Sequence, residues 1–244
     1  MITENFFTPP LYCIIALMKI SVVIPAYNEE KLLGKCLKSL KNQTEKPFEI
    51  IVVDNNSTDQ TAAIAKKMGA RVITEKQQGI SFARNAGFDA AKGGIIARID
   101  ADTEAFPNWL ARIKKDIETD DKDAITGPAY YADPSSKLRF SHLVSAYYFQ
   151  FLKLLYKNYM LFGPNMALKK TLWEKVKNEV CMDNTKVHED FDLAIHLWKY
   201  TKIGFDEDLR VITSPRRWKS VGSDIEYTTR LFKMLKNHHL IHLS

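Results

Sequence analysis

The sequence predicts an α/β fold with a mostly parallel central sheet and helices on both faces. Short apolar, β-branched segments alternate with longer segments of helical periodicity through the first half of the chain, as in strand–helix–strand units. The composition, 45% hydrophobic and 26% charged over 244 residues, is that of a globular chain with one sizeable core. Right-handed crossovers should then bring all strand ends to one edge of the sheet.

The first half should contain four strands and three helices. Runs of apolar residues predict strands at residues 20–24, 50–53, 72–73 and 95–99. Helical spacing of apolar residues predicts helices within residues 32–40, 62–65 and 80–91. Pro25 should end the first strand, Ser57 or Thr58 should cap the second helix, and Gly93 with Gly94 should close the third.

The second half is less regular. Helices are expected over residues 107–117 and from Glu189 to about residue 198, and short strands near residues 203–205 and 211–213. Residues 138–162 are aromatic with interspersed lysines, which suits either a core segment or a membrane interface. The Gly163-Pro164-Asn165 sequence should break that segment.

Bulk charge does not select a partner, because the net charge of +6 is spread along the chain and forms no dense arm. Cys13, Cys36 and Cys181 are odd in number and far apart, which argues against a disulfide framework and favours a reducing, cytoplasmic compartment. Residues 11–18 are apolar but shorter than the roughly 20 residues of a membrane span. We expect residues 1–17 to be an extension ahead of a natural start at Met18.

Acidic residues occur at three places, each at the end of a predicted strand or in a loop. They are Asp54, the Asp100-Ala101-Asp102 sequence and the Glu189-Asp190 pair. Tyr27, Asp54 and Asp102 should converge at the edge of the sheet where α/β folds bind ligands. Several carboxylates at one edge would repel each other without a cation, which indicates a site for a divalent metal and a nucleotide.

Four motifs in order give the chain a resemblance to a known family. They are VVIPAYNEE at residues 22–30, VVDNNSTD at 52–59, GISFARNAG at 79–87 and DAD at 100–102. With this order and spacing, the chain from Met18 to about Arg217 resembles the family 2 glycosyltransferases of the GT-A fold. The resemblance implies an inverting enzyme that uses a nucleoside diphosphate sugar and a divalent metal.

The resemblance also implies which residues bind the nucleotide. The loop Pro25-Ala26-Tyr27 should cradle the nucleobase, and Glu29 should contact the base or the ribose. Asp54 should accept hydrogen bonds from the base or the ribose. A plain strand-to-helix turn is the competing interpretation of the first loop.

Three further segments complete the implied donor site. Gly79 should allow close backbone approach, and Arg84 should reach the diphosphate or support the acidic loop, unless it only forms a surface ion pair. Asp102 should bind Mn²⁺ or Mg²⁺, with Asp100 facing the ribose and Ala101 between them. Asn55 and Asn56 are expected to be turn residues.

The remaining implied residues concern the transfer step. Asp190 should be the base that takes the acceptor proton, with Glu189 beside it, unless both acids only favour a helix N-terminus. Asn165 should hydrogen-bond sugar hydroxyls, unless its segment is a simple turn. Arg217 should contact the diphosphate or the acceptor, and Pro215, where relatives carry glutamine, argues against processive polymer synthesis.

The sequence therefore predicts transfer of a hexose or N-acetylhexosamine from a UDP- or GDP-sugar to a glycan or lipid-linked acceptor, in cell-surface glycan or glycolipid synthesis. We expect residues 18–105 to bind the nucleotide sugar, 106–220 to bind the acceptor, and 221–244 to form an amphipathic tail. Peripheral contact with the inner face of a membrane is open, and no nucleic acid is expected. Two alternatives are a non-catalytic nucleotide-sugar binding protein and a sugar nucleotidyltransferase, although PAYNEE replaces the latter's glycine-rich, lysine-containing loop.

Overall fold

The computed structural model describes residues 19–131, 141–183, 185–216, 234 and 238 of the chain. The described strands are all short. They are β1 (Ile20–Ala26), β2 (Glu49–Asp54), β3 (Arg71–Thr74), β4 (Ile95–Arg98), β5 (Thr103–Ala105), β6 (Ala124–Thr126), β7 (Ala129–Tyr131), β8 (Met166–Lys169), β9 (Gly204–Phe205) and β10 (Val211–Thr213). The helices are α2 (Leu33–Lys41), α3 (Thr61–Lys67), α4 (Ile80–Ala90), α5 (Trp109–Glu118), α6 (Ser141–Tyr156), α7 (Lys170–Val176) and α8 (Glu189–Leu197).

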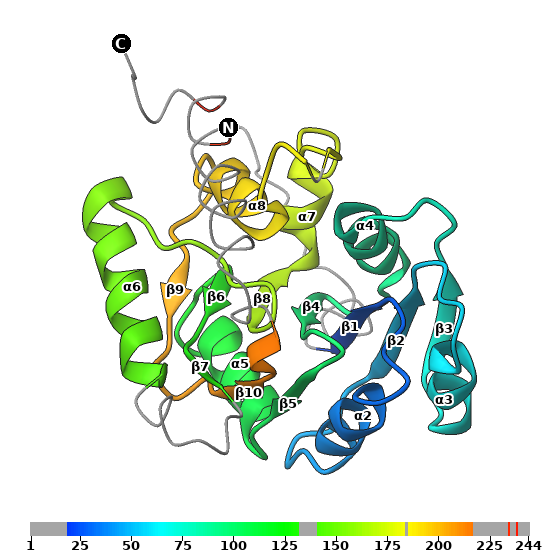
Figure 1. Cartoon of the computed structure of the whole chain (residues 1–244). Helices are drawn as coiled ribbons and strands as arrows, with labels where there is room; N and C mark the ends of the chain where they lie inside the picture. Colours follow the sequence, from blue (N-terminus) through cyan, green and yellow to red (C-terminus); the bar gives the residue numbers. More distant parts are fainter. Residues whose placement is uncertain (1–18, 132–140, 184, 217–233, 235–237, 239–244) are drawn as a thin grey trace, which may run out of the picture.

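The central sheet has the strand order β3-β2-β1-β4-β8-β6-β9, as Figure 1 shows. Strands β3, β2, β1 and β4 are parallel, with Ala26 paired to Asp54 at the carboxyl end of β1 and β2. Strand β8 runs antiparallel to β4 and to β6. The predicted fold class, an α/β fold with a mostly parallel sheet, is therefore confirmed.

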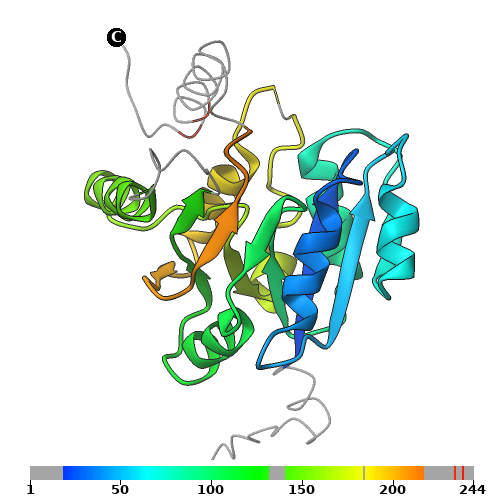
Figure 2. The same cartoon turned by 60° about the horizontal axis from the view of Figure 1, so that its bottom comes forward.

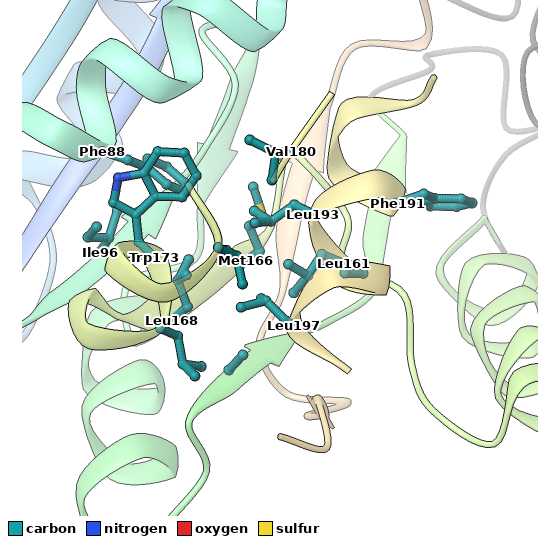
Figure 3. Close-up of a cluster of buried hydrophobic side chains, with 14 of the residues drawn as sticks. Phe88, Ile96, Leu161, Met166, Leu168, Trp173, Val180, Phe191, Leu193 and Leu197 are labelled. Atoms are coloured by element: carbon teal, nitrogen blue, oxygen red, sulfur yellow. The ribbon is translucent and has the colours of Figure 1, made fainter. Parts of the chain in front are cut away.

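Alternate side chains of each central strand point to opposite faces of the sheet. Val23 belongs to a core shared with α4, α7 and α8, whereas Val22 and Ile24 belong to a second core shared with α2 and α5. Figure 3 shows part of the first core, where Trp173 of α7 lies against Phe88 of α4 at 5.3 Å between ring centroids. Helices therefore cover both faces of the sheet, as predicted.

Two local predictions in the first half were wrong. Strand β1 continues through Pro25 to Ala26, because proline needs no N–H here and the pairing with Val53 and Asp54 continues. Ser57 does not cap α3. Its hydroxyl accepts a hydrogen bond from the Asn28 N–H at 3.0 Å, and α3 begins four residues later at Thr61.

The second half contains elements that apolar periodicity did not predict. Strands β5, β6, β7 and β8 and helix α7 all lie in this half. Strands β5, β10 and β7 form a separate small sheet beside the central one. These strands are short, and pairing with strands far along the chain decides them.

Helix α6 lies at the outer edge of the molecule in both views (Figures 1 and 2). It ends at Tyr156, before the predicted break at Gly163. None of the described helices is long and apolar enough to cross a bilayer. The predictions for residues 1–17 and for residues 221–244 fall outside the described part of the chain, apart from Met234 and His238.

Candidate active site

The loops after β1 and β2 are tied together at the carboxyl edge of the sheet. The Asn55 N–H donates to the Ala26 carbonyl at 2.8 Å. The Glu29 N–H donates to the Thr61 hydroxyl at 2.8 Å, and the Asn28 side-chain oxygen accepts from the Thr58 N–H at 2.8 Å. Asn28 adopts a left-handed φ of 54°, which asparagine tolerates well. The loop that carries the predicted nucleobase contacts is therefore fixed to the neighbouring strand.

The predicted nucleotide-binding residues differ in exposure along this edge. Pro25 and Ala26 are buried, while the Tyr27 side chain is 46% exposed. Asp54 is 7% exposed, and one of its carboxylate oxygens accepts from the Ser57 N–H at 3.3 Å. Tyr27 thus offers its side chain at the surface, Glu29 is partly exposed and Asp54 is buried.

Asn55 connects this edge to the start of α4. Its amide group donates to the Glu75 and Gln77 carbonyls at 3.0 and 2.8 Å, and its side-chain oxygen accepts from the Gly79 N–H at 2.7 Å. Gly79 has φ 149°, a conformation that side chains rarely adopt. Asn55 is therefore more than a turn residue, because it positions the glycine ahead of α4.

Glu29 and Asp102 meet at one arginine, although they come from different loops. The Arg216 guanidinium donates to Glu29 at 2.6 Å and to Asp102 at 2.9 Å. Burial raises the pKa of Glu29, and the carboxylates of Asp102 and Asp100 add to that rise, while Arg216 opposes it. Glu29, Asp100 and Asp102 thus form an acidic cluster. Among the described residues, the half-exposed Arg216 pairs with two of these acids.

The acidic cluster fits a divalent cation. One oxygen of Glu29 is buried without a hydrogen-bond partner. The side chains of Asp100 and Asp102 are 19% and 17% exposed, so both stay accessible from solvent, and Ala101 between them is buried. Carboxylate oxygens are the ligands that Mg²⁺ and Mn²⁺ prefer.

Glu189 is held between two buried arginines. Arg84, with no exposed surface, donates to the Glu189 carboxylate at 2.8 Å and to the Glu189 backbone carbonyl. Arg98, 2% exposed, bonds the other carboxylate oxygen of Glu189 and reaches Asp100 at 3.1 Å. Burial alone would lower the pKa of Arg98, but the carboxylates of Glu189 and Asp100 raise it, so the Arg98 guanidinium stays ionised.

Asp190 is the neighbouring acid, and it is half-buried. One carboxylate oxygen accepts from the Gly163 N–H at 2.9 Å, and the other accepts from the Phe191 N–H at 2.9 Å. Burial raises the pKa of Asp190 and the nearby Glu189 carboxylate adds to that rise, while Arg98 opposes it. A carboxylate with a raised pKa, fixed by backbone donors, is suited to accept a proton.

Gly163 is required by the close approach of Arg98. A Cβ atom at this position would lie 2.8 Å from a guanidinium nitrogen of Arg98. Because the Gly163 N–H also holds Asp190, this residue connects the arginine–glutamate group to the proposed base.

Two residues predicted at the donor site are fully buried. Arg84 pairs with Glu189, which is joined through Arg98 to Asp100, so its position agrees with the predicted support of the acidic loop and not with a surface ion pair. Asn165 is fully buried too, and its amide bonds the Trp109 indole and the carbonyls of Pro128 and Leu209. Its donors are both used, which leaves none for a sugar hydroxyl.

Sequence reasoning missed Arg98 and Arg216. Arg98 lies within the apolar strand IIAR, and an arginine there is rarely buried without a carboxylate partner, so the pattern held a usable signal. Arg216 lies next to the predicted Arg217, which is outside the described residues. Nothing in the sequence shows which of the adjacent residues Arg216 and Arg217 contacts the acidic cluster.

Comparisons with known proteins agree on one family. The family model described as "Glycosyl transferase family 2" matches residues 21–176. The chain is similar to glycosyltransferase AglE of Haloferax volcanii, with 34% identity over 48% of this chain and 41% of that protein. It is also similar to glycosyltransferase GlyA of Streptococcus pneumoniae, with 32% identity over 54% of this chain and 20% of that protein. The chain spans less than half the length of these relatives.

Solved structures share the fold. Mannosyltransferase PcManGT from Pyrobaculum calidifontis, in complex with GDP-Man and Mn²⁺, has a TM-score of 0.69 and 18% identity, over 93% of this chain and 65% of that one. Glucosyl-3-phosphoglycerate synthase from Mycobacterium tuberculosis, in complex with Mn²⁺, UDP and phosphoglyceric acid, has a TM-score of 0.66 and 21% identity, over 93% and 80%. At these identities the likeness establishes the GT-A fold alone.

Proposed function

This chain belongs to glycosyl transferase family 2, and from that premise we propose that it transfers a sugar from a nucleoside diphosphate sugar to an acceptor hydroxyl with inversion. The observation that carries the proposal is the clustering of Glu29, Asp100 and Asp102 at one sheet edge, where α/β folds bind ligands. The sequence PAYNEE follows β1, where a nucleotidyltransferase would carry a glycine-rich, lysine-containing phosphate loop.

The donor nucleotide is proposed to lie over the carboxyl ends of β1 and β2. Tyr27 offers an exposed ring on which a nucleobase can stack, and Glu29 and Asp54 offer acceptors for base or ribose hydroxyl and N–H groups. Support comes from similar structures that bind GDP-Man or UDP. The donor base is proposed to be uracil or guanine, and the sugar a hexose or N-acetylhexosamine.

A divalent cation, Mn²⁺ or Mg²⁺, is proposed to bind at Asp102 with Asp100 and Glu29 nearby, and when bound it supplies positive charge that stabilises the leaving nucleoside diphosphate. Arg216 now pairs with both Glu29 and Asp102. We infer that donor binding competes for these contacts, which frees the arginine, and its neighbour Arg217, to pair with the diphosphate.

Asp190 is the proposed base. It would take the proton from the acceptor hydroxyl as that oxygen forms its bond to the sugar C1 and the bond from C1 to the diphosphate oxygen breaks. Attack opposite the leaving group inverts C1, and a single base is enough because no enzyme nucleophile is needed. Glu189 is then a positioning residue, since both carboxylate oxygens are engaged by buried arginines. A non-catalytic nucleotide-sugar binding protein would not need a base, so it does not explain the position of the Asp190 carboxylate.

The acceptor is proposed to be a glycan or lipid-linked glycan, in cell-surface glycan or glycolipid synthesis. The support is an apolar face on α6 with five exposed residues, which suits work beside a membrane. They are Tyr147, Tyr148, Phe151, Leu154 and Leu155. On this basis we propose that the protein works at the inner face of a membrane as a peripheral protein.

A thermal-shift panel tests the donor proposal. Ligands that bind the native state raise the unfolding midpoint by mass action. We expect a rise with one series among UDP-, GDP-, CDP- and dTDP-sugars, and a larger rise with Mn²⁺ present. Asp102→Asn should remove the metal-dependent part and Glu104→Gln, a matched change at an exposed acid two residues away, should not. No shift with any donor in either condition would contradict the proposal.

A further inference from the structure

Three side chains that the proposed transfer reaction does not use gather beside α8. Asp192 and His196 lie one turn apart on this helix, and His238 comes from the C-terminal part of the chain. One potential ligand atom from each lies within 4.8 Å of the others. One Asp192 oxygen is 2.8 Å from His238 Nε2 and 3.8 Å from His196 Nε2. Two imidazole nitrogens and a carboxylate oxygen therefore lie close enough together to bind one metal ion.

Polar groups lie beside the outer atoms of the group, as they do in known metal sites. Metal-binding histidines usually direct their second nitrogen at a carboxylate or carbonyl, and metal-binding carboxylates are hydrogen-bonded in turn. His196 Nδ1 lies 3.4 Å from a Glu179 oxygen on the side away from Asp192. The second Asp192 oxygen accepts the Cys181 N–H at 2.8 Å. Neither contact involves an inner ligand atom, and the inner atoms Asp192 Oδ1 and His238 Nε2 are hydrogen-bonded to each other.

Hydrogen bonding within the group does not account for His196. Its Nε2 is too far from Asp192 for a hydrogen bond, and its buried Nδ1 has no partner with hydrogen-bond geometry. A cation between the three residues would use the nitrogen that faces Asp192.

We propose that Asp192, His196 and His238 form a second metal site that takes Zn²⁺ and fastens the C-terminal segment to α8. Imidazole nitrogens with one carboxylate suit Zn²⁺, whereas the all-oxygen cluster at Asp102 suits Mg²⁺ or Mn²⁺. Met234, which lies four residues before His238, is fully buried in the core that includes Leu193 and Leu197 of α8. The site therefore joins the C-terminal segment to the helix that carries Glu189 and Asp190. It shares no residue with the proposed transferase site.

Zn²⁺ binding to metal-free, full-length protein tests the proposal. Titration calorimetry should give one Zn²⁺ per chain in the Asp102→Asn variant, in which the predicted donor metal is removed. His196→Ala and His238→Ala should each weaken this binding, and Glu179→Gln should weaken it roughly 10-fold or more by releasing His196. His188→Gln, a buried histidine at the start of the same helix and outside the group, is the matched control and should bind as wild type.

A second readout separates the metal site from the transferase proposal. Zn²⁺ should raise the unfolding midpoint of wild type and of Asp102→Asn without any donor present, and should not raise that of His238→Ala. Co²⁺ in place of Zn²⁺ should give a visible absorption band that His196→Ala abolishes. Zn²⁺ affinity unchanged in both histidine variants, or lost only on Asp102→Asn, would overturn the proposal. Circular dichroism confirms that each variant is folded before binding is compared.

Discussion

The two oxygens of Asp190 are both occupied by backbone donors. Gly163 and Phe191 each provide an N–H at 2.9 Å. Backbone donors orient a carboxylate without neutralising it, so Asp190 keeps lone pairs for an acceptor proton. The Glu189 carboxylate, in contrast, is paired with two guanidinium groups. Neighbouring acids in the sequence thus have different environments and are suited to different roles.

Asp190→Asn tests that division of roles. An amide of the same shape cannot take the acceptor proton, so we expect kcat to fall roughly 10²- to 10⁴-fold while the donor Kd stays within about two-fold. The measurements are steady-state transfer and donor titration on the same preparation. Full transfer activity with normal donor binding would show that another group is the base.

Gly163→Ala tests how sensitively Asp190 is positioned. The added methyl group would lie 2.8 Å from the Arg98 guanidinium, so the loop or the arginine has to move. Because a displacement of about 1 Å near reacting groups costs on the order of 10²-fold, we expect a comparable loss of kcat with donor Kd little changed. Gly34→Ala is the matched control, since its new Cβ would only touch Met68 at 3.9 Å. Equal activity of both variants would show that the position tolerates the change.

Predictability from the sequence differs sharply among these residues. Asp54 and Asp102 follow predicted strands, so position along the chain was enough to expect them at one edge, whereas Asp190 was predicted from the family resemblance. Asn165 was expected to contact ligand but is buried, and for Arg84 the sequence left ligand contact and loop support open, because local sequence does not show which distant groups satisfy a side chain. Arg84 depends on Glu189, which is 105 residues away.

At the scale of elements, buried charge joins β4, α4 and α8. Arg98 is on β4, Arg84 is on α4 and Glu189 opens α8. The four strands and three helices of the first half were predicted because each has apolar periodicity of its own. The short strands β5 to β8 were not, because they depend on partners far along the chain. The ion pairs of Glu189 with Arg84 and Arg98 could not be predicted from apolar periodicity either.

Glu189→Gln measures how much this connection contributes to stability. Two buried guanidinium groups would lose their shared counter-charge, and breaking a buried ion pair from one side costs about 3–5 kcal/mol. We expect the free energy of unfolding to fall by that amount, which lowers the urea midpoint while the m-value stays unchanged.

The control for that measurement is Arg71→Gln. Arg71 pairs with Glu49 at 3.1 Å and is 39% exposed, so its removal should change the midpoint little. If Glu189→Gln and Arg71→Gln lowered the urea midpoint equally, burial would not determine how much the Glu189 ion pairs contribute to stability.

At the scale of the whole molecule, the apolar surface is concentrated on one edge. Phe149 and Leu152 of α6 are buried against the core, and Phe149 packs on Phe205 at 5.7 Å. The opposite side of α6 carries the five exposed apolar residues named above, the most exposed being Leu154 at 78%. Lys153 of α6 and Lys157, which follows the end of the helix, are exposed as well. Helix α6 could therefore lay its exposed apolar face on a membrane interface while its buried side stays packed against the protein.

Vesicle binding decides whether this face meets a membrane. We expect the protein to sediment with vesicles of phosphatidylglycerol and phosphatidylcholine, and to bind less as salt screens the lysines or as the anionic lipid is left out. The Phe151→Ser, Leu154→Ser double variant should lose binding because large apolar side chains contribute about 1.5–3 kcal/mol each when fully buried. Phe48→Ser removes an aromatic side chain of 45% exposure away from α6 and should bind as wild type. Unchanged binding of the double variant would mean that α6 does not contact the bilayer, and the acceptor would then be sought among glycans free in solution.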